Sequence, residues 1–417
     1  MNFFLVALIN FFLTYFIVQT NEKKVLFIVH TETINGKGVV ELYKKMKEKN
    51  AKVTVAFVPL LSGNEILYDL DVNFSKKFQI EDCIFPCGKT PPYKIVDKIK
   101  ENFDYIFVQN PYNSFKGTIL ESTFSLENLK KKTNKLAYIV YGPHLFHQTT
   151  CNDMQLKEKI DIVFVDSVST KKVFVEQMRF KDINVVVSGY QSYKNVRDKM
   201  NKRQKKRETI LWMPRWTLHF NNRHQHESGS TFLSYYLFFI NYAKENKHIN
   251  FIIRPHVLLF KNAINQKFLK KEEVEYIILS FKKLNNVRFS EHINSPLEED
   301  IIESDIVIAD GTSALAEAVV AKKPIIYLSN GINKEFESND LGIEFKNYIY
   351  FAHHPVEIIQ CIENIRKNSY SPFVISHNSY NFVKKFKFLI NYERFRKRLD
   401  PVENPAEFIA DYVIKGN

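Results

Sequence analysis

The sequence predicts an α/β protein made of two Rossmann-like units that face one cleft, with a hydrophobic helix at its amino terminus. Short apolar runs of strand length alternate with helical patterns along most of the chain, which is typical of parallel sheets covered by helices. A strongly basic stretch interrupts this alternation near the middle, and the pattern then restarts. A length of 417 residues also exceeds one typical core, which favours two domains.

The amino-terminal segment Met1 to Val18 is apolar apart from three polar residues. It lacks a basic leading region and a small-residue cleavage site, so a secretory signal peptide is not indicated. Its length is that of the shortest membrane-spanning helices. Lys23 and Lys24 follow it, and positive charge on that flank favours a cytoplasmic body. We expect residues 1–20 to attach the chain to the cytoplasmic face of the cell membrane, by spanning it or by lying on it.

The first Rossmann-like unit is predicted over residues 23–190. Its apolar strands are expected at Val25 to His30, Ala51 to Pro59, Tyr105 to Gln109, Leu136 to Tyr141, Ile162 to Val165 and Val185 to Ser188. Glycines follow the first strand, at Gly36 and Gly38, but the Gly-x-Gly-x-x-Gly pattern of dinucleotide sites is incomplete. No phosphate-loop lysine motif occurs either, so the sequence implies no bound cofactor.

The segment 191–208 is predicted to be an exposed basic linker. It shows no apolar periodicity, and its cations are Lys194, Arg197, Lys199, Lys202, Arg203, Lys205, Lys206 and Arg207. The second unit follows over residues 209–365. Its strands are expected at Thr209 to Met213, Phe251 to Arg254, Val287 to Phe289, Ile306 to Ala309 and Ile325 to Leu328, where we expect the unit to close.

A helical segment is expected at the end of the chain, over residues 366–417. Between Phe382 and Arg398 it mixes basic residues with aromatic and aliphatic ones. Such a mixture can lie flat on an anionic membrane surface. The alternative is a helix that packs on its own protein and keeps its lysines in solvent.

Two strand ends in the second unit carry the polar residues of a candidate site. Arg254-Pro255-His256 follows one apolar run, and Asp310-Gly311-Thr312-Ser313 follows another and leads into a helix with Glu317 in its first turns. The carboxyl edge of a parallel sheet is where such proteins bind ligands. A helix start with hydroxyl residues favours a phosphate, and the cations at the neighbouring strand favour it further. The alternative for Thr312 or Ser313 alone is an ordinary helix cap.

Four blocks in this order resemble the CDP-glycerol glycerophosphotransferases of teichoic-acid and capsule synthesis. The blocks are Ile210 to Thr217, Phe251 to His256, Ser304 to Ser313 and Lys323 to Tyr327. The resemblance covers roughly Thr209 to Asn330 well and extends more loosely across Asp104 to Gly189. It implies a GT-B fold and a transferase that moves glycerol phosphate, or a related phosphopolyol, from a CDP-activated donor to a polymer or lipid-linked acceptor.

The resemblance also implies roles for individual residues. Arg254 and His256 would contact the donor pyrophosphate, Thr312 and Ser313 would hold phosphate oxygens, and Glu317 would sit near the ribose. The same blocks contribute Arg215, Asp310 and Gly311 to the expected donor site, with His256 counted as catalytic. The family's amino-domain Trp-His-Gly motif is absent; the nearest segment here is Tyr141 to His147.

In such a transfer an acceptor hydroxyl attacks phosphorus and CMP leaves, so positioned cations and N–H donors carry most of the catalysis. A base with a pKa near 7 assists the attack, and histidine has that property without tuning. His144 follows a predicted strand of the first unit, so we expect it to act as the base from across the cleft, with His147 as the next choice. No residue cluster here demands a metal.

Two other functional classes are alternatives. A GT-B glycosyltransferase that takes a nucleotide sugar would use the same helix start and Glu317. A nucleic-acid-binding protein would be drawn by the net charge of +13, but the cations lie in a linker and a terminal helix without a recognition module, so no nucleic-acid partner is expected. The four cysteines form no disulfide framework, which favours a reducing compartment.

Overall fold

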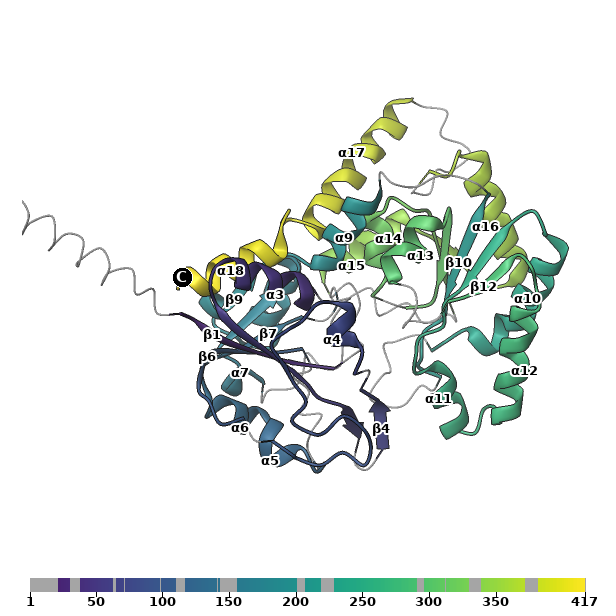
Figure 1. Cartoon of the computed structure of the whole chain (residues 1–417). Coiled ribbons are helices and arrows are strands. Elements are labelled where there is room, and N and C mark those ends of the chain that lie inside the picture. Colours follow the sequence, from purple (N-terminus) through teal and green to yellow (C-terminus); the bar gives the residue numbers. More distant parts are fainter. Residues whose placement is uncertain are drawn as a thin grey trace, which may run out of the picture.

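The protein consists of two α/β units, each built on a parallel sheet (Figure 1). The structure is a computed structural model. It describes residues 22–30, 38–62, 65–70, 72–97, 99–109, 117–140, 142, 156–200, 207–218, 229–290, 296–311, 313–329, 339–371 and 382–416. The predicted α/β class with two parallel sheets is confirmed.

The first unit contains a seven-stranded sheet in the order β5-β2-β1-β6-β7-β8-β9, in which all neighbouring strands are parallel. The strands are β1 (Lys24–Val29), β2 (Lys52–Phe57), β5 (Cys83–Ile84), β6 (Phe103–Val108), β7 (Thr133–Ile139), β8 (Ile162–Val165) and β9 (Val185–Val187). Their side chains are apolar on both faces because helices cover both, and a buried core lies on each side of the sheet. An antiparallel hairpin, β3 (Leu60–Ser62) and β4 (Glu65–Tyr68), follows β2.

Short helices connect these strands. They are α3 (Val39–Glu48), α4 (Phe74–Lys77), α5 (Glu121–Phe124), α6 (Leu126–Lys130), α7 (Leu156–Lys159) and α8 (Val168–Lys172), and α8 runs into a π-helical turn over Val173–Gln177. Gly38 begins α3 with φ of 73°, where a side chain would collide with Gln191. Glycine is therefore required where α3 meets the helix that leads to the second unit.

The second unit contains a six-stranded parallel sheet in the order β12-β11-β10-β13-β14-β15. The strands are β10 (Thr209–Met213), β11 (Asn250–Ile253), β12 (Val287–Phe289), β13 (Ile306–Ala309), β14 (Ile325–Leu328) and β15 (Tyr350–Ala352). The helices are α10 (Phe232–Glu245), α11 (Leu259–Asn265), α12 (Lys271–Lys282), α13 (Leu297–Glu303), α14 (Leu315–Val320), α15 (Asp340–Phe345) and α16 (Pro355–Lys367). The chain progresses outward from β10 in both directions, so the strand order reverses between β10 and β13.

Two sequence expectations are corrected here. The second unit does not close at β14, because β15 adds a further edge strand. The segment expected to be an exposed linker begins as a packed helix, α9 (Gln191–Met200), in which Tyr193 and Val196 have no exposed surface. Its apolar residues recur every three or four positions among many cations, and that spacing buries one face against α13 and α14.

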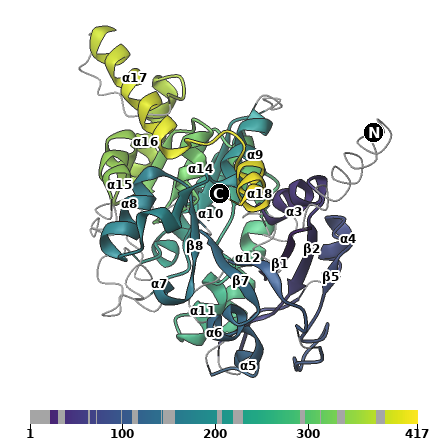
Figure 2. The ribbon, with the colours of Figure 1, turned by 90° about the vertical axis from the view of Figure 1, so that its left-hand side faces the viewer.

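The end of the chain connects both units. Helix α17 (Phe382–Leu399) buries Tyr392, Phe395 and Leu399 against the second unit. Helix α18 (Pro405–Lys415) then returns to the first unit and lies beside α3 and α9, as Figure 2 shows. Its apolar face completes the core on one side of the first sheet. The predicted terminal segment therefore spans the two units.

The hydrophobic amino-terminal helix expected over residues 1–20 lies outside the described residues. Among the helices that the structure describes, none is both long and apolar enough to span a bilayer. On α17 the exposed positions include Phe386, Leu389 and Ile390, alongside exposed cations such as Arg394 and Lys397. One face of α17 thus packs on the protein, and the other presents apolar and basic side chains to solvent.

Candidate functional site

The candidate site lies where the strand order of the second sheet reverses, between β10 and β13. Ligands of open α/β sheets bind outside the carboxyl ends of strands at such a point. Asp310 lies directly after β13 and connects the loop after β13 to the loop after β10. Its carboxylate accepts the backbone N–H of Arg215, after β10, at 2.6 Å, and the N–H and hydroxyl of Thr231 at 2.5 and 2.7 Å. The loops after β10 and β13 and the start of α10 are thereby fixed relative to one another.

Asp310 is fully buried, so it presents no surface to a donor. Its observed contacts position the two loops, and its predicted place in the donor site stays a prediction. Burial raises the pKa of Asp310 to about 6, although the hydrogen bonds from Thr231 and Arg215 and the charge of Arg215 oppose that rise. Arg215 itself is almost fully buried beside it.

His256 belongs to the loop after β11 and lies against the loop after β10. Its backbone N–H donates to the Pro214 carbonyl at 3.0 Å, and its ring stands 6.2 Å from the Trp216 ring, centroid to centroid. The Leu258 N–H points at its Nδ1 from 3.2 Å. Nδ1 accepts this bond only in the neutral ring, so the proton of that ring is on Nε2. The arrangement prepares Nε2–H to donate a hydrogen bond.

Arg254 points into the protein and not toward solvent. Its Nη1 lies 2.6 Å from Asp300 and 3.1 Å from Ser290, and both Arg254 and Asp300 are buried. Burial alone would raise the pKa of Asp300, but Arg254, Ser290 and Arg288 hold it below its ordinary value. Arg254 therefore joins β11 to α13 structurally, and its contact with a donor pyrophosphate stays a prediction.

Ser313 lies at the turn before α14 and faces the first unit. The N-cap position of α14 is Ala314, which has no capping side chain, and the Ser313 carbonyl accepts the Ala316 N–H. A Cβ placed on Gly142, which follows β7, would lie 3.2 Å from the Ser313 hydroxyl oxygen. The carboxyl edges of the two sheets thus meet here, with no side chain on Gly142 between them.

A second contact joins the units on the other side of the site. The Lys261 ammonium, on α11, donates to the Ile66 carbonyl in β4 at 2.5 Å. The β3–β4 hairpin of the first unit therefore reaches the loop region that also carries His256. In Figure 1, β4 and α11 lie opposite each other at the lower side of the molecule.

Glu317, on α14, is also buried and lies toward α9. Desolvation raises its pKa to about 7, although its own backbone N–H and the Ser192 hydroxyl stabilise the charged form, and nearby Glu298 and Asp166 raise the pKa further. Among the described residues, its Oε2 has no hydrogen-bond partner. Glu317 therefore lies at the junction of the two units, and its predicted place near a ribose stays a prediction.

Several predicted site residues fall outside the described residues, namely His144, His147 and Thr312. Gly311 is described, with a φ of 57° that suits glycine. Within the part of the chain that the structure covers, no group of three or more potential metal ligands gathers. Sequence reasoning missed Thr231, Ser290, Asp300 and Gly142, because long-range pairing to a buried carboxylate or to an opposite edge leaves no local signal.

No family model and no curated protein matches this chain. Solved structures do. The wall teichoic acid polymerase TagF superposes with a TM-score of 0.57 at 11% identity, over 94% of this chain and 88% of that one. A UDP-GlcNAc 2-epimerase from Neisseria meningitidis, bound to UDP-GlcNAc, gives 0.52 at 12% identity, over 94% of this chain and all of that one.

The fold is of the GT-B type. A putative UDP-N-acetylglucosamine 2-epimerase from Listeria monocytogenes matches at a similar level, with a TM-score of 0.51 at 12% identity, over 95% of this chain and 98% of that one. The GT-B fold predicted from the sequence resemblance is thus supported along nearly the whole chain. At these identities the likeness extends to the fold alone, since one fold hosts many reactions.

Proposed function

We propose that this chain is a GT-B transferase that takes a nucleotide-activated donor, and specifically that it moves glycerol phosphate or a related phosphopolyol from a CDP-activated donor to an acceptor hydroxyl, releasing CMP. The observation that carries the proposal is the meeting of Ser313 with the carboxyl edge of the first sheet at Gly142. It brings the Ser313 hydroxyl opposite Gly142, which precedes His144 by two residues in the sequence. TagF, one variant of which was soaked with CDPG, shares this fold.

Each residue of the candidate site has its own role in the proposed transfer. His256 donates from Nε2 to a phosphoryl or leaving-group oxygen, where negative charge increases in the transition state. The Ser313 hydroxyl contacts the donor phosphates, and Asp310 keeps the loops that carry Arg215 and Thr231 in place. His144 removes the proton of the attacking hydroxyl. Positioning and charge stabilisation account for most of the rate in such a transfer.

A nucleotide-sugar glycosyltransferase for surface polysaccharide is the second candidate. What favours it is the comparable superposition on a UDP-GlcNAc 2-epimerase bound to UDP-GlcNAc, which spans the whole of that chain. Incubating the purified protein with a panel of CDP-polyols and nucleotide sugars separates the two. Release of CMP supports glycerol phosphate transfer, whereas release of UDP or GDP supports the glycosyltransferase.

The acceptor is proposed to be a cell-surface polymer or a lipid-linked precursor, met at the cytoplasmic face of the membrane. Two features support this location. Met1 to Val18 is an apolar sequence of membrane length. The outer face of α17 exposes Phe386, Leu389 and Ile390 among basic residues, as expected of a helix that contacts an anionic bilayer.

A further inference from the structure

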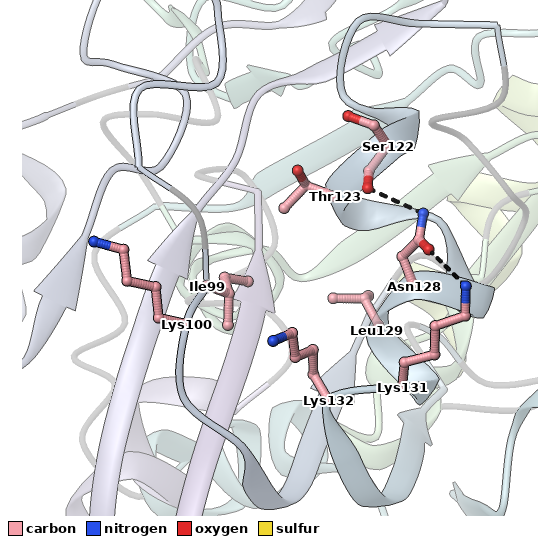
Figure 3. Close-up of a pocket in the computed structure, with 8 residues that line it drawn as sticks. All are labelled: Ile99, Lys100, Ser122, Thr123, Asn128, Leu129, Lys131 and Lys132. Atoms are coloured by element: carbon pink, nitrogen blue, oxygen red, sulfur yellow. Dashed lines mark hydrogen bonds between the residues drawn. The ribbon is translucent and has the colours of Figure 1, made fainter.

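A second concave site lies on the first unit, away from the carboxyl edges. It is a pocket of about 430 Å³, shown in Figure 3. Three lysines line it, Lys100, Lys131 and Lys132, together with the hydroxyl residues Ser122 and Thr123. Two aliphatic side chains form the apolar part of its wall. Cations and hydroxyl donors are the groups that bind a phosphate ester.

The positive charge of the pocket is not neutralised by the protein. Among the described residues, Lys100, Lys131 and Lys132 form no ion pair. Lys131 donates to the Asn128 amide oxygen at 3.3 Å, and that amide is itself held by the Glu121 and Ser122 carbonyls. Three acidic residues of the surrounding elements pair with other lysines: Glu101 with Lys52, Asp161 with Lys130, and Glu127 with Lys159. A fourth, Glu121, accepts the Gly117 N–H at 2.8 Å.

The pocket lies at the amino edge of the first sheet. Lys100 precedes β6, and Lys131 and Lys132 precede β7, its neighbour. The candidate transfer site is at the opposite, carboxyl edge. Strand β1 pairs with β6 on the other side, and the Lys24 N–H at its start donates to Asp104 of β6 at 2.9 Å. The point where the described chain begins is therefore one strand away from β6 and the lysines before it.

The apolar sequence Met1 to Val18 ends six residues before Lys24. Six residues span at most about 20 Å. A membrane-attached amino terminus therefore keeps this edge of the sheet, and the pocket with it, near the headgroups. We propose that the pocket binds the phosphate of anionic phospholipid headgroups and thereby orients the first unit on the bilayer. The proposal rests on the membrane attachment proposed above and not on the transfer reaction.

Full-length protein is tested for sedimentation with vesicles of phosphatidylcholine alone and with vesicles containing 30 mol% phosphatidylglycerol. Three proteins are compared: the unchanged chain, the triple variant Lys100→Gln, Lys131→Gln and Lys132→Gln, and a matched triple variant of exposed lysines on the second unit, Lys247→Gln, Lys271→Gln and Lys283→Gln. Binding to the neutral vesicles measures the contribution of the apolar segment Met1 to Val18. The additional binding to the anionic vesicles measures the contribution of the basic surface.

The pocket variant is expected to lose on the order of 100-fold of the gain on anionic vesicles, about fivefold for each lysine, while the matched variant keeps it. Equal losses in both variants, or no loss in either, overturn the proposal. A parallel series replaces chloride by inorganic phosphate at constant ionic strength. Saturable displacement of the unchanged chain from the anionic vesicles, absent in the pocket variant, is expected, because inorganic phosphate and the headgroups would compete for the same lysines. Saturable binding of phosphate to the pocket without any displacement from the vesicles would mean that the pocket takes soluble phosphate, and would overturn the membrane assignment.

Discussion

At the scale of single residues, Glu317 at the junction between the units destabilises the folded state when its carboxyl group is charged. Burial raises the pKa of Glu317 to about 7 from its ordinary value of 4.5. Between these two values the unfolded chain has released its proton while the folded chain retains it, so stability falls as the pH rises through this window.

Glu317→Gln is therefore expected to stabilise the protein progressively between pH 5 and pH 8. The gain in the free energy of unfolding relative to the unchanged chain should grow by about 2 to 3 kcal/mol across that range. Urea unfolding at both values measures it. The exposed Glu363→Gln serves as the control and should show no such growth. If the difference in the free energy of unfolding between Glu317→Gln and the parent were the same at both pH values, it would contradict the raised pKa of Glu317.

His256→Ala is expected to lower kcat/KM by about 100-fold, as the loss of one donor to a developing charge would. His256→Gln tests how the side chain acts. A glutamine amide keeps an N–H donor but cannot transfer a proton, so partial recovery in this variant indicates hydrogen bonding from Nε2. The exposed His248→Ala is the matched control. Turnover within a few-fold of the parent in His256→Ala would remove His256 from the site.

At the scale of elements, the start of α14 differs from ordinary capped helices of the same protein. Ser167 caps α8 by accepting the Thr170 N–H, whereas at α14 no described N–H donates to the Ser313 hydroxyl. Ser313→Ala should therefore leave the free energy of unfolding unchanged and weaken donor binding by about tenfold or more. Ser167→Ala should do the reverse, with a loss of about 1 kcal/mol in stability.

The two measurements are urea unfolding and the KM for the donor identified by nucleotide release. A stability loss in Ser313→Ala with unchanged donor KM would assign Ser313 to folding. Because both variants remove one hydroxyl near the start of a short helix, the comparison isolates what the hydroxyl contacts.

The strands show how much of the fold could be predicted from the sequence. Continuous apolar runs such as Ile162–Val165 and Ile306–Ala309 were predicted with their correct bounds, since strands buried on both faces leave a strong local signal. Helix α9 was missed because its three apolar residues alternate with as many cations inside a longer basic stretch. Strand β15 was missed, although β12, the other three-residue edge strand of the same sheet, was predicted with its correct bounds. The sequence motifs of the site were recognised. The hydrogen-bond partners of Asp310 and Arg254 could not be predicted, because they are distant in sequence.

At the scale of the whole molecule, the approach of the two units depends on the absence of a side chain at Gly142. Gly142→Val should hold the carboxyl edges apart, because even a Cβ would lie 3.2 Å from the Ser313 oxygen. We expect at least a tenfold loss of kcat/KM, a smaller loss in Gly142→Ala, and unchanged unfolding of each unit. Full activity in that variant would show that the edges need not approach.

The return of α18 to the first unit also has a consequence during synthesis. Lys49, directly after α3, pairs with Glu407 on α18, 358 residues later in the chain. At about 5 to 20 residues per second, the ribosome needs roughly 20 to 70 s to make the intervening chain. Throughout that time one face of the first sheet lacks the apolar cover that Ile409 and Val413 supply in the finished protein. The nascent first unit is thus a natural client for chaperones until the last residues emerge.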